Sequence, residues 1–233
     1  MDARAAVVAC FGRGDPQFAG AVKAMAELAV VSGFSVCVWE GGPLRFSEGE
    51  ESSRRGIPAD SLRRGIPAAS FSIVIAGHGS EERAGLGNGS GLSLAPSVIA
   101  IPRSARLYLL GCYQGRDDLR EQWVRGCGLP SEGVQGAEGE TESLLSTLFL
   151  MHCAAEGAVA VGRIFTDWVL ANRIVRPHFT AARRLYARTG GDPLAVLDFL
   201  QRTTDLSPVE LFLSLARRRP EFLTGLLAAE GRL

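Results

Sequence analysis

A histidine and a cysteine each follow a short apolar run that ends in glycine. The first run is SIVIAGHG, residues 72–79, and the second is LYLLGCYQG, residues 107–115. Thiolate sulfur is a nucleophile for acyl transfer, imidazole can carry the protons, and backbone N–H groups can stabilise an oxyanion. Glycine suits such turns because it lets a substrate carbonyl approach the backbone closely. The pattern therefore indicates a dyad of Cys112 and His78.

Either residue alone is weak support for catalysis, because a lone histidine after a strand is more often a turn residue and a lone cysteine is more often core. The runs at 71–77 and 105–111 are nearly continuous in apolar residues. This is expected for strands that are covered on both faces. Reactive groups of open parallel sheets lie beyond the carboxyl ends of the strands, so neighbouring strands would bring His78 and Cys112 to one edge.

Short apolar runs alternate with helical patterns along the chain, which is typical of βαβ units and a largely parallel sheet. We expect strands at 5–11, 34–40, 71–77, 105–111 and 158–162, and helices at 18–33 and 141–157. From about residue 165 the pattern is helical to the end, with breaks at Arg176-Pro177, 190–193, Ser207-Pro208 and Pro220.

Length and composition fit one α/β domain, since the chain has 233 residues of which 46% are hydrophobic. Twenty-five basic residues balance twenty-five acidic ones, so neither nucleic acid nor an anionic membrane is indicated as a partner. The first apolar run is too short for a membrane span and lacks a signal-peptide layout, so we expect a cytoplasmic protein. Five cysteines without a C-x-x-C pair argue against a disulfide framework or a thiolate zinc site.

The paired motifs resemble those of the caspase-like cysteine peptidases (clan CD), the superfamily of caspases, legumains, gingipains, separases and the CHAT-domain group. The CHAT group is favoured by three segments, which are LLGCYQG at 109–115, GETESLLSTLFLMHCAAEGAVAVGRIFTD at 139–167 and TGGDPLAVLDFLQ at 189–201. The resemblance covers about residues 71–204. The chain departs from the group at Ile164-Phe165, where a Leu-Trp pair is usual, and at Cys153, where a smaller residue is usual.

The resemblance implies a three-layer α/β/α caspase-like fold over residues 1–204, with a helical C-terminal extension at 205–233 packed on the same domain. It also implies a cysteine endopeptidase in which Cys112 is the nucleophile and His78 its partner. The backbone N–H groups of Gly79 and Cys112 would hold the oxyanion. No metal or organic cofactor is implied. The partners would be a protein or peptide substrate and an activating sensor or regulatory protein.

Substrate specificity depends in this superfamily on the nucleophile turn and on the chain that leaves the next strand, here 163–168. Asp167 is the acidic residue best placed to receive arginine or lysine before the scissile bond. Arg163 could instead select an acidic side chain, and Asp117 or Asp118 could supply the charge from the nucleophile loop. Asp167 could also cap the following helix. We favour a basic preference.

A repeated RRGIPA, at 54–59 and 63–68, lies in and beside a loop rich in glycine, serine and charge. Two copies cannot build a solenoid, so a solvated basic loop is the plain interpretation. If the enzyme accepts basic residues, the two Arg-Arg pairs are candidate sites of self-cleavage.

Three other interpretations remain. GHGS also occurs in small tetrapyrrole chelatases, but there it follows the first strand, and of the other histidines, His152 and His178, the former lies inside an apparent core helix. GLGNGSGLS at 85–93 suggests a phosphate loop or a serine elbow, yet it lacks the Lys-Ser/Thr ending and the glycine two residues before Ser90, so we expect a flexible loop there. The third is a catalytically silent scaffold that uses the fold to bind partners.

Overall fold

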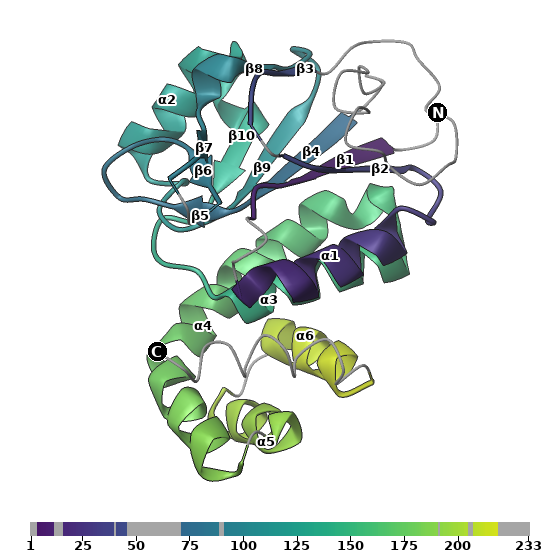
Figure 1. Ribbon diagram of the computed structural model, residues 1–233, viewed down its shortest axis with the longest axis vertical. Coiled ribbons are helices and arrows are strands. Elements are labelled where there is room, and N and C mark those ends of the chain that lie inside the picture. Colours follow the sequence, from purple (N-terminus) through teal and green to yellow (C-terminus); the bar gives the residue numbers. More distant parts are fainter. Residues whose placement is uncertain are drawn as a thin grey trace.

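Five strands form a parallel sheet in the order β10-β9-β4-β1-β2 (Figure 1). Their bounds are Arg4–Ala9 (β1), Phe34–Val38 (β2), Phe71–Ala76 (β4), Arg106–Leu110 (β9) and Val134–Gly136 (β10). The structure is a computed structural model that describes residues 4–11, 16–39, 41–45, 71–88, 91–190, 192–204 and 207–218. The prediction of a mixed α/β fold with a mostly parallel sheet is confirmed.

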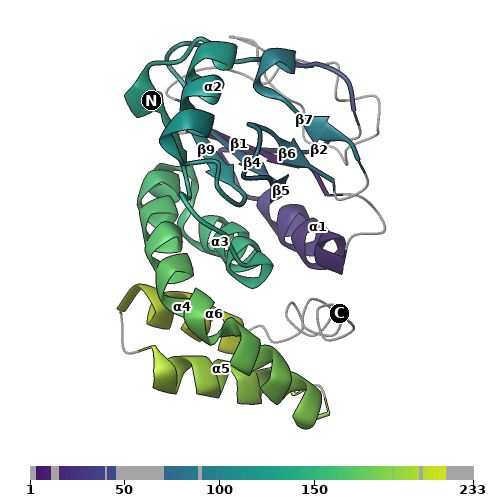
Figure 2. The ribbon, with the colours of Figure 1, turned by 90° about the vertical axis from the view of Figure 1, so that its left-hand side faces the viewer.

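Helices cover both faces of this sheet (Figure 2). They are α1 (Pro16–Leu28), α2 (Asp117–Cys127), α3 (Ser143–Glu156), α4 (Val161–Arg188), α5 (Pro193–Thr203) and α6 (Ser207–Arg218). Helix α2 packs on one face, α1, α3 and α4 contribute to the core of the other, and α5 and α6 pack against α4. Short 3-10 helices lie at η2 (Pro96–Val98), η3 (Ser131–Gly133) and η4 (Ala158–Ala160).

Two small sheets lie beside the main one. A three-stranded antiparallel sheet consists of β5 (His78–Gly79), β6 (Leu86–Gly87) and β7 (Ser93–Leu94). A parallel pair joins β3 (Leu44–Arg45) to β8 (Ile99–Ala100). The glycine-rich stretch at 85–93 therefore contributes β6 and the start of β7, and both leucines of these strands are buried.

Strand β1 explains why the central strands read as continuous apolar runs. Ala5, Val7 and Ala9 point into the core with α1, α3 and α4, whereas Ala6 and Val8 point into the core with α2. Side chains alternate between the two faces of a strand, so a strand covered on both faces needs apolar residues at every position.

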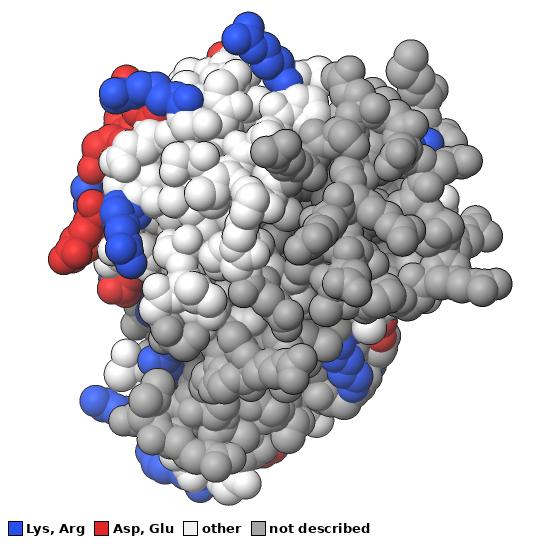
Figure 3. Space-filling model, turned by 45° about the horizontal axis from the view of Figure 1, so that its top comes forward, with Lys and Arg blue, Asp and Glu red and all other residues white. Residues whose placement is uncertain are grey.

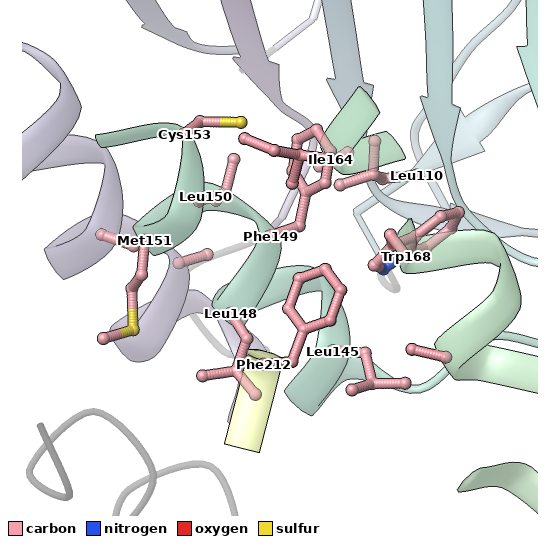
Figure 4. Packing of buried hydrophobic residues seen from close by; sticks show 14 of the residues in the cluster. Leu110, Leu145, Leu148, Phe149, Leu150, Met151, Cys153, Ile164, Trp168 and Phe212 are labelled. Carbon is pink, nitrogen blue, oxygen red and sulfur yellow. The ribbon is translucent and has the colours of Figure 1, made fainter. Parts of the chain in front are cut away.

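Buried side chains of α3, α4 and α6 pack against one another and hold the long helix α4 in place (Figure 4). Phe149 of α3 and Phe165 and Trp168 of α4 are buried, with ring centroids of Phe149 and Trp168 6.4 Å apart. Tyr108 of β9 packs against Phe165 with a centroid distance of 5.0 Å. Aromatic contacts of this kind join α4 directly to the strand that leads to Cys112.

The prediction of a strand at 158–162 is wrong. Residues 158–160 form η4, and α4 begins at Val161. A short run of alanine and valine suits a helix turn as well as a strand, and the exposed fraction of Val159 is 81%, which a central strand would not allow. The fifth strand of the sheet is instead the three-residue β10.

Two predicted helix boundaries also differ. Helix α1 ends at Leu28, and Gly33, with φ of 90°, lies in the turn before β2. Helix α4 continues through Pro177. Proline removes one helical hydrogen bond, but Val175 and Phe179 on either side are buried, so packing holds the helix together across it.

Other expectations lie outside the described residues. These include the repeated RRGIPA with its two Arg-Arg pairs and the break at Pro220. Of the predicted extension at 205–233, the structure describes residues 207–218, which are helical. No helix in the described part of the chain has the length and apolar character needed to cross a bilayer.

Gly115→Ala is expected to destabilise the fold, because a Cβ there would lie 2.1 Å from the carbonyl oxygen of Gly136. Backbone atoms cannot swing aside, so the free energy of unfolding should fall by about 1–3 kcal/mol. Gly139→Ala is the matched control, since the nearest atom to its Cβ would be Arg176 Nη1 at 3.8 Å. Urea unfolding followed by circular dichroism measures both variants. Equal stabilities would contradict the close approach.

Candidate active site

The carboxyl ends of β4 and β9 meet at one edge of the sheet. The two strands are neighbours, with Ala76 opposite Leu110, and the Gly77 N–H donates to the Leu110 carbonyl over 3.1 Å. A Cβ on Gly79 would lie 2.7 Å from the backbone nitrogen of Cys112 and 2.1 Å from its carbonyl oxygen. Only glycine fits at this position, and the two motifs singled out in the sequence therefore meet backbone to backbone.

A cavity of about 740 Å³ opens at this edge, and we call it the Cys112 cavity. Its volume is within the usual range for ligand sites. It is bordered by the turn after β9 that contains Cys112, by the segment that precedes α3 and by one side of α4. The lining residues are Gly79, Cys112, Tyr113, Glu140, Thr141, Glu142, Arg176, Pro177, Phe179, Thr180 and Arg183.

The Cys112 thiol lies against Thr141. The backbone N–H of Thr141 donates to Sγ over 3.3 Å, the hydroxyl oxygen lies 3.6 Å from Sγ, and the carbonyl oxygen lies 3.8 Å from it. A donor directed at sulfur suits a thiolate, since hydrogen bonds to charged groups are the stronger ones. Sequence reasoning assigned no role to Thr141, although it lies in the segment 139–167 that carries part of the resemblance. It lies 29 residues from Cys112.

The turn after Cys112 is strained and well anchored. Tyr113 has φ of 63°, which is rare for a bulky residue. Its N–H donates to the Gly139 carbonyl over 2.8 Å, and its phenol donates to Glu140 over 3.0 Å. Partial burial and this hydrogen bond raise the pKa of the Tyr113 phenol. Such conformations persist where the surroundings over-determine them, and they are common at functional sites.

Gln114 holds the surrounding segments together and is fully buried. Its Oε1 accepts hydrogen bonds from the Gly85 N–H (2.9 Å) and the Trp123 indole N–H (2.8 Å). Its Nε2 donates to the carbonyls of Ser80 (3.2 Å) and Cys112 (3.1 Å). The four contacts use the full hydrogen-bonding capacity of the amide. We assign Gln114 as a positioning residue, which the sequence pattern did not reveal.

His78 lies on β5, immediately before Gly79, and its side chain is exposed. The imidazole ring meets the Phe11 ring edge-on, with a centroid distance of 5.9 Å. Gly79 lines the Cys112 cavity, whereas His78 is not among the described residues that line it. The structure thus brings Gly79 to the backbone of Cys112 and places the His78 imidazole against Phe11, two residues beyond the end of β1.

The residues predicted to select the substrate do not line the Cys112 cavity. Asp167 and Arg163 face each other one turn apart on α4, with Nη1 and Oδ2 3.3 Å apart, and Arg163 also pairs with Glu156. They lie on a helix because the strand expected at 158–162 is absent there. Asp117 is 98% exposed at the start of α2 and pairs with Arg120. The charges at the cavity are instead Glu140, Glu142, Arg176 and Arg183.

Helix α2 carries alternating charges on its outer side. Figure 3 shows acidic and basic side chains interleaved along this edge of the molecule. The exposed pairs here are Arg116–Asp118, Arg120–Asp117 and Arg125–Glu121. Exposed pairs of this kind contribute little to stability, so α2 presents a solvated face near the cavity.

His152 is buried in α3, as expected from its position in an apolar helix. Its ring meets Phe212 of α6 edge-on at a centroid distance of 5.5 Å, and Nδ1 lies 3.1 Å from Glu156. Within the described ranges, no group of three or more His, Cys, Asp or Glu residues is placed to hold a metal ion.

Limited alkylation is expected to modify Cys112 first. Burial raises the pKa of Cys37 and of Cys127 to about 12, and burial also raises the pKa of Cys10 and Cys153. Between pH 7 and 9 these four thiols therefore remain protonated and unreactive, whereas Cys112 lines an open cavity. Peptide mapping by mass spectrometry after substoichiometric iodoacetamide identifies the site. Earlier modification of Cys37 or Cys127 would sink this expectation.

Gln114→Leu is expected to destabilise the site and the fold together. It would leave the buried N–H groups of Gly85 and Trp123 without an acceptor. Each unpaired buried donor costs about 1–3 kcal/mol, so unfolding should become easier by at least about 2 kcal/mol. Gln122→Leu is the control, since Gln122 is exposed on the neighbouring helix. Thermal unfolding compares the two, and a similar melting temperature for both would speak against the role of Gln114.

Comparison with known proteins gives no assignment. No protein-family model matches the chain, and no curated protein matches it significantly. Any function must therefore be argued from the residues and geometry of the Cys112 cavity.

Proposed function

We propose that the protein is a cysteine endopeptidase with a caspase-like fold, in which Cys112 is the nucleophile and His78 manages the protons. The observation that carries the proposal is the meeting of Gly79 and Cys112 on the wall of one cavity, where two neighbouring parallel strands end. The helices on both faces of the parallel sheet agree with the three-layer α/β/α arrangement that the sequence resemblance implies.

The first half of the reaction forms an acyl-enzyme. The Cys112 thiolate attacks the scissile carbonyl carbon, and the electron pair of the carbonyl moves onto oxygen. When this tetrahedral intermediate collapses, the C–N bond breaks and His78 gives its proton to the departing amine. A thioester between Cys112 and the amino-terminal part of the substrate remains.

Water completes the reaction. Neutral His78 takes a proton from water, and the oxygen attacks the thioester carbon. The C–S bond then breaks, the carboxylic acid product leaves, and thiolate and imidazolium are restored. The reaction consumes no oxidant or reductant, because hydrolysis involves no net oxidation or reduction, and Cys112 and His78 supply the nucleophile and the proton carrier.

The oxyanion would be held by the backbone N–H groups of Gly79 and Cys112. A Cβ on Gly111 would lie 3.3 Å from the Gly79 nitrogen, and a Cβ on Gly79 would lie 2.7 Å from the Cys112 nitrogen. The two nitrogens thus lie in the same tightly packed junction, which has no room for side chains. Fixed donors of this kind need no reorganisation when charge develops on the substrate.

His78 must turn its imidazole toward the cavity to act on this substrate. Its side chain is exposed, and turning it would break the ring contact with Phe11. Catalytic hydrogen bonds are often long or misaligned without substrate and tighten when it binds. We propose that substrate binding, a partner protein or self-cleavage brings His78 into place. The protein partners would then be a peptide or protein substrate and an activating regulator.

A binding scaffold without catalysis is the second candidate, and the contact between His78 and Phe11 is the observation that favours it. Against it, a scaffold has no need of a thiol in an open cavity. A partner surface would also not require glycine at position 79, where the packing against Cys112 leaves no space for a side chain.

Cys112→Ala and His78→Ala are each expected to lower kcat/KM by at least about 1,000-fold, because they remove the nucleophile and the proton carrier. A fluorogenic peptide library, screened with the full chain, measures the effect. Cys37→Ala is the matched control, since this thiol lies on β2 and its pKa is raised by burial to about 12. Equal cleavage by wild type and Cys112→Ala would exclude Cys112 as the nucleophile. A chain that binds peptides without cleaving them would favour the scaffold.

A further inference from the structure

Two ion pairs connect α4 with the segment that precedes α3, and all four residues line the Cys112 cavity. Arg176 Nη2 lies 2.5 Å from Glu140 Oε2, and Arg183 Nη2 lies 3.4 Å from Glu142 Oε2. Thr141, between the two glutamates, contacts the Cys112 sulfur. Both carboxylates are therefore next to the residue that meets the nucleophile.

Glu142 is the better shielded and better fixed of the two carboxylates. Its side chain is 13% exposed, whereas that of Glu140 is 51% exposed. The Glu142 N–H donates to Asn172 Oδ1 over 2.7 Å, and buried Asn172 donates in turn to the Trp168 carbonyl. Glu140 already accepts from the Tyr113 phenol and from Arg176.

Arg183 is the more easily displaced partner of this pair. Its side chain is 44% exposed, and its guanidinium lies over the Phe179 ring, 5.0 Å from the centroid. The contact of 3.4 Å to Glu142 is long for a charge-assisted hydrogen bond. An aromatic face beside a carboxylate is a suitable site for a guanidinium group.

The charges favour a basic ligand over an acidic one. If a substrate guanidinium takes the place of Arg183, Glu142 keeps a positive partner and Arg183 moves into water, where half of it already lies. If a substrate carboxylate takes Arg183 instead, the shielded Glu142 loses this ion pair and gains no cation in exchange. Breaking a shielded ion pair is the costlier result.

We infer that Glu142 selects substrates with arginine or lysine before the scissile bond. Arg183 occupies the position beside the Glu142 carboxylate until such a side chain displaces it. This inference rests on the proposed peptidase function and assigns the basic preference to a residue other than Asp167. Phe179 provides the stacking surface for the incoming group.

Peptidyl chloromethyl ketones that differ only in a terminal Arg, Leu or Asp test the inference without requiring turnover. The Cys112 thiolate displaces chloride, which leaves with its electron pair, and a thioether forms. Intact mass of the full chain gives the rate. The Arg reagent should react about 10- to 100-fold faster than the Leu reagent, as expected for one charge-assisted hydrogen bond.

Glu142→Gln should abolish this ratio, because the Arg reagent loses the carboxylate that binds its guanidinium group. Glu138→Gln is the matched control, since Glu138 is 72% exposed, pairs with Arg173 and does not line the Cys112 cavity. Arg183→Met should raise the rate of the Arg reagent. A fall in that rate would mean that Arg183 itself binds the substrate. It would overturn the inference that a substrate side chain displaces Arg183 from Glu142.

The outcomes separate the two proposals. If the Leu or Asp reagent reacts fastest, or if Glu142→Gln keeps the preference for Arg, Glu142 is not the selecting residue and the peptidase proposal stands. If no peptidyl reagent modifies Cys112 faster than chloroacetamide does, the cavity does not bind peptides and both proposals fail.

Discussion

The buried amide of Gln114 joins three segments on which the candidate site depends. It accepts from Gly85 and Trp123 and donates to Ser80 and Cys112, so the β5–β6 hairpin, helix α2 and the turn after Cys112 share one side chain. Without Gln114, each segment would leave a backbone or indole group near the core without a hydrogen-bond partner from this amide. Because a buried network is stable only when all its members are paired, small displacements of any segment are costly. The network therefore opposes movement of any one of these segments relative to the others.

The hydrogen bonds of Gln114 also help to hold the strained turn at Tyr113 in place. A positive φ at a bulky residue costs of the order of 1–3 kcal/mol, and the turn holds because hydrogen bonds fix both sides of it. Gln114 fixes the Cys112 carbonyl, and the Gly139 carbonyl accepts from Tyr113. Glycine at 79 then lets the two strand ends come into contact. A substrate would meet backbone donors that are already in place.

Periodicity and strand-end chemistry predicted the part of the site that is local in sequence. The apolar runs before His78 and Cys112 gave the correct strands, β4 and β9, because strands buried on both faces need apolar residues throughout. Thr141 and Gln114 escaped prediction because their roles depend on contacts with segments about thirty residues away. The run at 158–162 misled because alanine and valine fit a helix turn equally well.

The positions of the charged side chains on the cavity wall depend on the aromatic core as much as on the ion pairs between them. Phe165, near the start of α4, is held against Tyr108 of β9, the strand that ends at Cys112. Arg176 and Arg183 lie further along the same helix, which Pro177 does not interrupt. The strand that ends next to Cys112 therefore also positions the helix that carries both guanidinium groups. Because a packed helix moves as a unit, core packing determines how far the Cys112 thiol lies from these guanidinium groups.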